Sequence, residues 1–170
     1  IACLIIVAAQ AGLSQSVRYY VDAMGGADEN DGKSPAAAWR SLEKINAHSF
    51  QPGDEILLKS GSSWTGRLSP KGSGTAGKPI VINKYDGDAK PRVDGSGIIG
   101  TATVYLHNQE YWEINNLEVT NDAITPGDRR GVLVSAFEAG VLHHIHLKNL
   151  DIHHIKGIVG NDNKAKRTAG

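Results

Sequence analysis

Residues 80–86 read IVINKYD, and the same pattern returns as WEINNLE over 112–118 and as IHLKNLD over 145–151. In each copy two apolar residues stand two positions apart, two polar residues follow, and the apolar alternation restarts one position out of phase. Successive side chains of a strand point to opposite faces. The apolar residues before and after this one-position shift can therefore all point inward only if the strand bends at the polar pair. Asparagine tolerates the left-handed backbone of such a bend, and Asn116 and Asn149 occupy it.

The copies follow one another at intervals of 32 and 33 residues. A repeat of this length, built from strands and irregular loops, predicts a solenoid. Its rungs should stack about 4.8 Å apart. We therefore expect Ile82, Ile114 and Leu147 to lie above one another in one interior column.

The composition excludes some classes of function. The 170 residues suffice for one domain with a hydrophobic core. The 18 basic and 18 acidic side chains balance without a basic stripe, which argues against a nucleic-acid partner. The 20 glycines, the frequent turn residues and the scarcity of helical periodicity indicate a protein of strands and loops.

The two ends of the chain differ from its middle. Residues 1–16 hold a short apolar run that includes Cys3, followed by an A-x-A site, and we interpret them as the remnant of a secretory signal peptide. A buried first strand or helix is the alternative. Residues 17–170 would then be a secreted domain without a stable membrane anchor. Because residues 161–170 are polar and show no capping pattern, we expect the opening part of a longer solenoid.

A single helix is expected near the start of the domain. Ser34 is a good N-cap, and Pro35 suits the first helical position. Trp39, Leu42 and Ile45 follow at helical spacing. A helix over 35–47 would lay these three side chains over the open end of the solenoid and shield its strand edges.

Each rung is expected to contain three strands. The first strands are predicted at 55–59, 103–107 and 132–135. The second and third strands of each rung are joined by the two-residue polar corner. The length of this corner should stay constant, while the loops at the other corners vary and accept insertions.

The chain resembles the amino-terminal portion of secreted right-handed parallel β-helix proteins of the pectate-lyase-like superfamily. The residues that carry this resemblance are 19–22, 30–35, 38–42, 50–58, Gly61, Trp64, 72–74, 77–80 and Tyr85. The resemblance covers about Tyr19 to Gly157. It implies an all-β, right-handed parallel β-helix with a short N-terminal capping helix. The same opening precedes polysaccharide lyases, glycoside hydrolases and proteins of unknown activity.

Three carboxylates form a candidate metal site. The repeat aligns Asp86, Glu118 and Asp151 at one outward position, so they could form a column on the outer wall. Ca²⁺ prefers oxygen ligands of this kind, and many pectate lyases, which the chain resembles, need calcium. A solvated acidic stripe is the alternative, because Ca²⁺ takes six to eight oxygen ligands.

Histidines gather near the end of the chain. His144 and His146 point to the same face of a predicted strand and could bind a metal ion. No carboxylate or cysteine completes the site at a recognisable spacing. Plain surface histidines are therefore the alternative.

Other residues are candidates for substrate binding. Arg129 and Arg130 could hold an anionic sugar, and Lys156 could add a contact. Trp64 could stack on a sugar ring or pack on the wall beneath the loop 61–78. Solvated loop residues are the alternative for the three cations. No catalytic residue of a lyase family can be mapped onto the chain.

These observations lead to a functional hypothesis. We expect a secreted, monomeric polysaccharide lyase that acts by β-elimination on a uronate-containing polysaccharide, with Ca²⁺ as its only expected cofactor. A glycoside hydrolase on the same scaffold is the second hypothesis, and it would need paired carboxylates across a groove. A noncatalytic glycan-binding or adhesive protein is the third, because a fold alone does not establish an activity.

Overall fold

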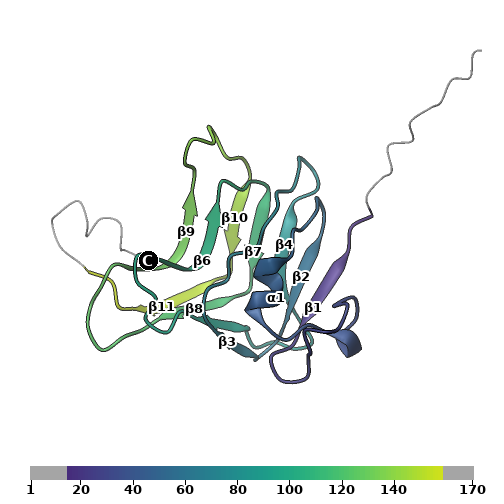
Figure 1. The fold of residues 1–170 in the computed structure, drawn as a ribbon, viewed down its shortest axis with the longest axis horizontal. Helices are drawn as coiled ribbons and strands as arrows, with labels where there is room; N and C mark the ends of the chain where they lie inside the picture. The colour runs from purple at the N-terminus through teal and green to yellow at the C-terminus, as the bar shows by residue number, and fades with distance from the viewer. Residues whose placement is uncertain (1–14, 159–170) are drawn as a thin grey trace, which may run out of the picture.

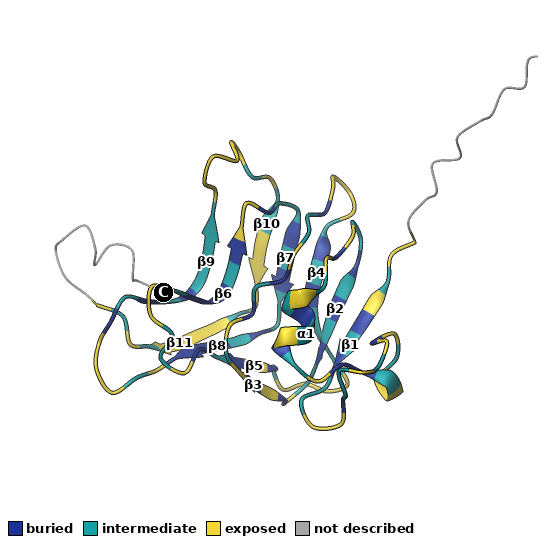
Figure 2. Cartoon of the chain, viewed as in Figure 1, coloured by how far each residue is buried: buried dark blue, intermediate teal, exposed yellow. Residues whose placement is uncertain are grey.

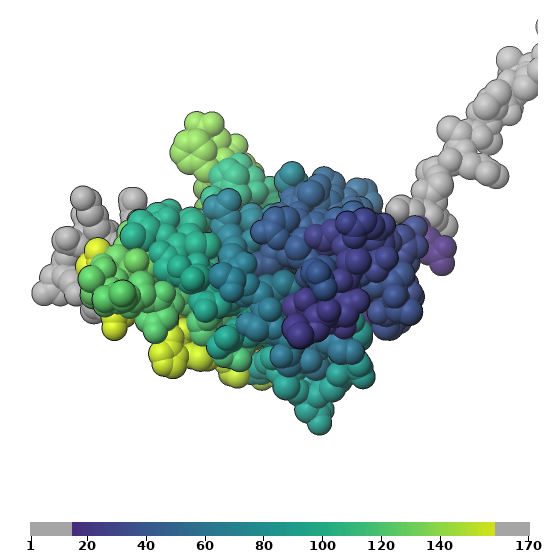
Figure 3. Space-filling view, turned by 60° about the horizontal axis from the view of Figure 1, so that its bottom comes forward, coloured from purple at the N-terminus to yellow at the C-terminus, as the bar shows by residue number. Residues whose placement is uncertain are grey.

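The computed structural model describes residues 15–158, and it is a parallel β-solenoid whose rungs follow one another in chain order (Figures 1 and 3). The strands form sheets of five, four and two members. The five-stranded sheet contains β1 (Arg18–Val21), β2 (Glu55–Lys59), β4 (Ile80–Tyr85), β7 (Trp112–Asn115) and β10 (Ile145–Lys148). The four-stranded sheet contains β3 (Ser63–Thr65), β5 (Arg92–Asp94), β8 (Glu118–Asn121) and β11 (Asp151–Ile155). The pair is β6 (Thr101–His107) with β9 (Arg129–Ser135).

The predicted stacking of Ile82, Ile114 and Leu147 is confirmed, although Leu147, on the last strand of this sheet among the described residues, is 45% exposed. Ile82 pairs with Ile114, and Ile114 pairs with Leu147, in parallel register. The column extends toward the N-terminal end of the solenoid through Ile56, which pairs with Ile82. Buried positions alternate along β2 and β7, whereas Figure 2 shows β10, the last strand of this wall among the described residues, as largely exposed. Each inward side chain therefore covers the one below it, and the hydrophobic core runs along the solenoid axis.

The predicted grouping of first strands is partly wrong. The segments around Val104 and Val132 do pair, as β6 with β9. However, β2 joins the sheet of the repeated segment, where it pairs with β4. The place above β6 is taken by Leu68, which forms an isolated bridge to Val104. All these strands show the same apolar alternation, so the pattern alone does not say which wall a strand joins.

The corner is constant in only two of the three copies. Two residues join β7 to β8, and two join β10 to β11. From β4 to β5 the chain instead makes a longer excursion over residues 86–91. The excursion ends at Pro91, whose carbonyl accepts a hydrogen bond from the Glu118 N–H of the next rung. The Leu117 carbonyl accepts the equivalent bond from the Asp151 N–H one rung later. The loop thus lengthens outward while the register of the next strand is preserved.

An asparagine ladder marks this corner. Asn116 and Asn149 have φ values of 57° and 54°, which confirms the left-handed bend. The Asn116 side-chain amide donates to Oδ1 of Asn83 at 2.8 Å, and the Asn149 amide donates to Oδ1 of Asn116. The corner is therefore stabilised within one rung by backbone conformation and between rungs by side-chain hydrogen bonds.

We expect Asn116→Ala to reduce the free energy of unfolding by about 2 kcal/mol, because a left-handed alanine is strained and the ladder is broken. Asn116→Gly relieves the strain but also breaks the ladder, and should cost about 1 kcal/mol. Urea denaturation of both variants measures the difference. Equal losses in the two variants would show that the left-handed backbone at Asn116 contributes nothing.

The predicted helix over 35–47 is interrupted. A 3₁₀ turn (Pro35–Ala37) capped by Ser34 is followed by an extended segment, and α1 (Leu42–Ala47) begins only after it. The interruption arises because Trp39 bridges to Val21, with its N–H donating to the Tyr20 carbonyl. A strand-like contact with β1 therefore prevails over helical propensity.

The capping role of this region is confirmed. The side chains of Trp39, Leu42 and Ile45 are buried in the core cluster. The Asn46 side chain from α1 donates to the Arg67 carbonyl at 2.7 Å and accepts from the Ser69 N–H at 2.6 Å. The helix thus lies over the first complete rung. The predicted signal-peptide remnant, residues 1–16, lies outside the described residues except for Gln15 and Ser16.

Asp28 anchors the start of α1. Its Oδ1 accepts hydrogen bonds from the Arg40 and Ser41 N–H groups at 2.9 and 3.0 Å, and its Oδ2 accepts from the Ser41 hydroxyl. Partial burial acts to raise the pKa of Asp28, but the bonds from Ser41 and Arg40 outweigh it and lower the pKa below 3.8. A carboxyl group with a depressed folded-state pKa adds stability above its unfolded pKa and loses it as the pH falls.

We therefore expect the stability contribution of Asp28 to be complete above about pH 4 and to disappear as the pH falls through its folded-state pKa. The stability gap between wild type and Asp28→Asn should be widest near neutral pH and should narrow under acid. Denaturant titrations across this range measure the gap, with the exposed Glu29→Gln as the matched control. A gap that does not change with pH would contradict the anchoring role.

Candidate functional site

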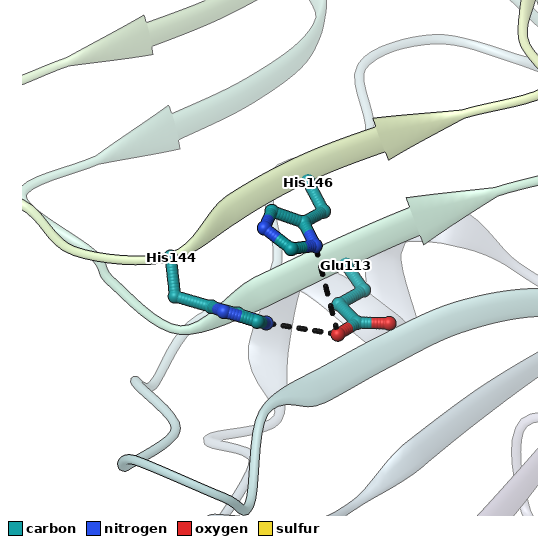
Figure 4. Close-up of side chains that lie close together, drawn as sticks. All are labelled: Glu113, His144 and His146. Carbon is teal, nitrogen blue, oxygen red and sulfur yellow. Dashed lines mark hydrogen bonds and ion pairs between the residues drawn. The ribbon is translucent and has the colours of Figure 1, made fainter.

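Two histidines and a glutamate converge on the outer face of the five-stranded sheet (Figure 4). Nε2 of His144 lies 2.8 Å from Oε1 of Glu113, and Nδ1 of His146 lies 4.0 Å from the same oxygen. One ligand atom from each of the three residues lies within 4.8 Å of the others. We call these three residues the Glu–His–His cluster.

The solenoid register creates this cluster. Glu113 on β7 pairs directly with His146 on β10, so both outward side chains stand at the same height along the wall. His144 precedes β10 and has a φ of 52°, a left-handed conformation that His adopts more readily than most residues. Its ring lies 4.0 Å from the His146 ring and is stacked 5.9 Å from Tyr111. Backbone pairing and ring contacts thus orient all three side chains.

The cluster is partly shielded from solvent. The exposed fractions of the Glu113 and His144 side chains are 29% and 32%, whereas that of His146 is 61%. Within residues 15–158, Glu113 forms ion pairs with these two histidines and with no Lys or Arg. His143 and Glu110 form a neighbouring pair that does not belong to the cluster. Hydrogen bonds from the side chain and backbone of His143 lower the pKa of the Glu110 carboxyl.

A second polar site lies on the outer face of the four-stranded sheet. It is a pocket of about 290 Å³. Its lining combines two carboxylates, one guanidinium, one hydroxyl and two imidazoles, from Arg92, Asp94, Thr120, Asp122, His153 and His154. We call it the wall pocket. Its side chains come from three successive rungs, because Asp94 pairs with Thr120 and Asp151 pairs with Glu118.

Several groups of the wall pocket are held in place by local contacts. One oxygen of Asp94 accepts the Ser96 N–H at 2.9 Å, and one oxygen of Asp122 accepts the Ala123 N–H at 2.8 Å. Thr120 is only 6% exposed, and its hydroxyl has no hydrogen-bond partner among the described residues. The hydroxyl oxygen is enclosed by protein atoms, so the polar groups left to meet a ligand are the carboxylates, the guanidinium and the imidazoles of the lining. The pocket can therefore offer donors and acceptors to a polyhydroxylated ligand.

The three carboxylates predicted as a metal column are not brought together. Asp151 and Glu118 are register neighbours, but the position above Glu118 is occupied by Arg92. Asp86 lies in the six-residue excursion and pairs with Lys59 at 2.7 Å. Asp151 pairs with Lys90 at 2.8 Å. Aligning the three copies of the repeat placed Asp86 in the column, because the alignment assumed that the corner has the same length in every copy.

The predicted substrate cations do not form one site. Arg129 is buried, and its guanidinium donates to the carbonyls of Gly97, Thr125 and Lys156 at 3.1, 2.9 and 3.2 Å. Arg130 forms an ion pair with Asp128 at 2.7 Å. Lys156 is exposed and contributes its backbone carbonyl to Arg129. Arg129 thus joins backbone segments and has no free face for a carboxylate.

Trp64 lies inside the wall. It is 6% exposed, belongs to the core cluster, and is in register with Val93 on the next rung. Its indole N–H donates to the Arg40 carbonyl at 2.7 Å, beside the start of α1. The ring faces are therefore covered by the core and are closed to a sugar.

The sequence prediction included His144 and His146 but missed Glu113. The repeat contained the signal that identifies Glu113, because it aligns residue 113 with residue 146 one rung later. Searching for ligands by spacing along the chain overlooks a partner that the solenoid places directly beside them.

The chain is similar to lacto-N-biosidases, although no family model matches it. A lacto-N-biosidase of Bifidobacterium longum subsp. longum is 30% identical over 205 residues, which cover 89% of this chain and 13% of that protein. The selenomethionine crystal structure of a GH136 lacto-N-biosidase from Eubacterium ramulus has a TM-score of 0.78 at 31% identity, covering 86% of this chain and 28% of that one. The native crystal structure gives 0.74 at 30% identity, with 85% and 28% covered.

These relatives correct the functional hypothesis. The expected polysaccharide lyase is wrong, because the similar proteins are GH136 lacto-N-biosidases, which are glycoside hydrolases. The second hypothesis, a glycoside hydrolase on a β-helix, fits better. The substrate of these similar proteins is a glycan, which agrees with the expected class of partner. Among residues 15–158, none of the helices is long and apolar enough to cross a bilayer.

Proposed function

We propose that the protein is a glycan-cleaving glycoside hydrolase related to lacto-N-biosidases, and that residues 15–158 form rungs of its β-helix. The observation that carries this proposal is the TM-score of 0.78 at 31% identity to the Eubacterium ramulus enzyme. Sequence and fold agree along the same 86% of the chain. Because the chain spans 28% of that enzyme and 13% of the Bifidobacterium longum relative, the activity is proposed for the whole protein.

Within this proposal, the wall pocket recognises sugar hydroxyl groups. Glycan recognition needs donors and acceptors placed on a rigid support, since an unpaired buried polar group on either side costs affinity. The pocket offers the guanidinium of Arg92 and the carboxylates of Asp94 and Asp122 on paired strands and their ends. Its position on a parallel sheet keeps these groups fixed relative to one another.

Hydrolysis by such an enzyme requires two carboxyl groups, one that protonates the leaving oxygen and one that acts as base or nucleophile. In the proposed enzyme the wall pocket recognises the sugar and does not cleave the bond. Substitutions in the pocket should therefore weaken substrate binding more than they slow the chemical step. In kinetic terms KM should rise while kcat changes little.

The test uses the full-length gene product that contains this chain. Incubation with a chromogenic lacto-N-bioside should release the chromophore together with an intact disaccharide. Asp122→Asn is nearly isosteric and removes the carboxylate charge, while its amide oxygen can still accept the Ala123 N–H, so it should raise KM without lowering the melting temperature. Glu138→Gln, at an exposed site away from the pocket, is the matched control. A folded, full-length protein that releases no chromophore would contradict the proposed activity.

A further inference from the structure

We propose that the Glu–His–His cluster is a binding site for a divalent transition-metal ion, with Zn²⁺ as the representative ion. The ligands would be one carboxylate oxygen of Glu113 and one ring nitrogen each of His144 and His146. This inference does not depend on the proposed hydrolase activity, because the cluster belongs to the five-stranded sheet and the wall pocket to the four-stranded sheet.

The distances fit a metal ion. Tetrahedral Zn²⁺ ligands at 2.0–2.2 Å from the ion lie roughly 3.4 Å apart. In the cluster, the two nitrogen-to-oxygen separations are 2.8 and 4.0 Å, and the full set of ligand atoms fits within 4.8 Å. Figure 4 shows both imidazoles turned toward the same oxygen of Glu113. Small rotations of the side chains would bring all three atoms to coordination distance.

The backbone has already organised these ligands. The parallel pairing of β7 with β10 places Glu113 beside His146 without any loop closure. The left-handed backbone at His144 directs its ring back toward the same oxygen, between Tyr111 and His146. Tyr111, at the equivalent position one rung earlier, has the same left-handed backbone with a φ of 57°, so this turn is a repeated feature of the solenoid. A ligand set fixed by packing binds a metal with a smaller loss of conformational entropy.

Charge supports the same conclusion. Within residues 15–158, Glu113 is paired with no lysine or arginine, so a cation would not have to displace one. Partial burial of Glu113 and His144 lowers the local dielectric and strengthens attraction between a divalent ion and the carboxylate. The exposed side of His146 leaves an entry path for the ion.

The donor set selects the class of metal. Two imidazole nitrogens and one carboxylate suit Zn²⁺, Cu²⁺, Ni²⁺ or Fe²⁺, whereas Ca²⁺ requires six to eight oxygen ligands. The cluster is therefore unsuited to the calcium expected from the sequence. Three protein ligands leave one position of a tetrahedral ion open to water or to a ligand hydroxyl. A bound ion would also link two successive rungs of the solenoid.

The experiment is a Zn²⁺ titration of the untagged protein in competition with a chromophoric chelator. Wild type should bind one equivalent with an affinity that falls at least about 10-fold in His146→Gln and in Glu113→Gln, because each removes a ligand. His153→Gln is the matched control, since it removes an exposed imidazole that is paired with Glu118 instead. The control should retain the wild-type affinity.

A second measurement guards against unfolding. The melting temperature of His146→Gln without metal should equal that of wild type, because this side chain is 61% exposed, and Zn²⁺ should raise the melting temperature of wild type only. Co²⁺ should give visible absorption bands in wild type that disappear in the variant. Equal Zn²⁺ affinities of wild type and His146→Gln, or loss of binding in His153→Gln, would overturn the proposal.

Discussion

Replacing Trp112 by alanine is expected to lower the free energy of unfolding by about 3–5 kcal/mol, the range for removing a buried aromatic side chain. Trp112 is fully buried at the start of β7, between Ile80 above and Ile145 below in the same ladder. Its ring makes an edge contact with Phe50 at 6.4 Å. The substitution would therefore leave a cavity that borders three rungs. None of these rungs can move to fill the cavity without losing its strand register.

A conservative variant separates the two roles of this tryptophan. The Trp112 indole N–H donates to the Gly72 carbonyl at 3.0 Å, and that carbonyl also accepts from the Gln109 side chain at 3.1 Å. Trp112→Phe keeps most of the packing and leaves the carbonyl paired, so it should cost about 1–2 kcal/mol. Urea denaturation measures both variants. Similar losses for phenylalanine and alanine would mean that the hydrogen bond, not the volume, carries the effect.

The second large effect concerns Arg129. We expect Arg129→Met to lower the free energy of unfolding by about 3 kcal/mol, because three backbone carbonyls lose charge-assisted hydrogen bonds from a buried guanidinium together. These carbonyls belong to Gly97, Thr125 and Lys156, which lie on two loops and the segment that follows β11. Arg129→Lys should recover only part of the loss, since an ammonium group lacks the planar fork of the guanidinium.

The control for Arg129 is Arg67→Met. Arg67 is exposed, and its substitution should change stability by less than about 0.5 kcal/mol. Thermal unfolding, followed by circular dichroism, compares the variants. If Arg129→Met kept the wild-type melting temperature and instead lost only glycan affinity, the substrate-binding role predicted from the sequence would be restored.

The repeat was sufficient to predict the fold. The spacing of Ile82, Ile114 and Leu147 predicted the solenoid and the stacking of these side chains, and both are confirmed. The polar corner at Asn116 was also predicted correctly. The assignment of walls failed for residues 55–59, because apolar alternation is identical in every wall and register is decided by contacts between rungs.

The site was harder to predict than the fold. The sequence pointed to His144 and His146, but their carboxylate comes from the previous rung and is distant along the chain. Arg129 and Trp64 were predicted as ligand contacts because their side chains suit sugars, yet both are buried by the core and the loops. Residue type alone does not reveal burial, and exposure decides whether a side chain can meet a ligand.

The long excursion of residues 86–91 shows how such a scaffold can diversify. It occupies the corner that is only two residues long in the following rungs, yet Pro91 and Leu117 receive equivalent hydrogen bonds from the next rung. Segments can thus be grafted at this edge without disturbing the strands on either side. New contacts could arise there by insertion, one rung at a time, while the central stack of side chains remains under unchanged selection.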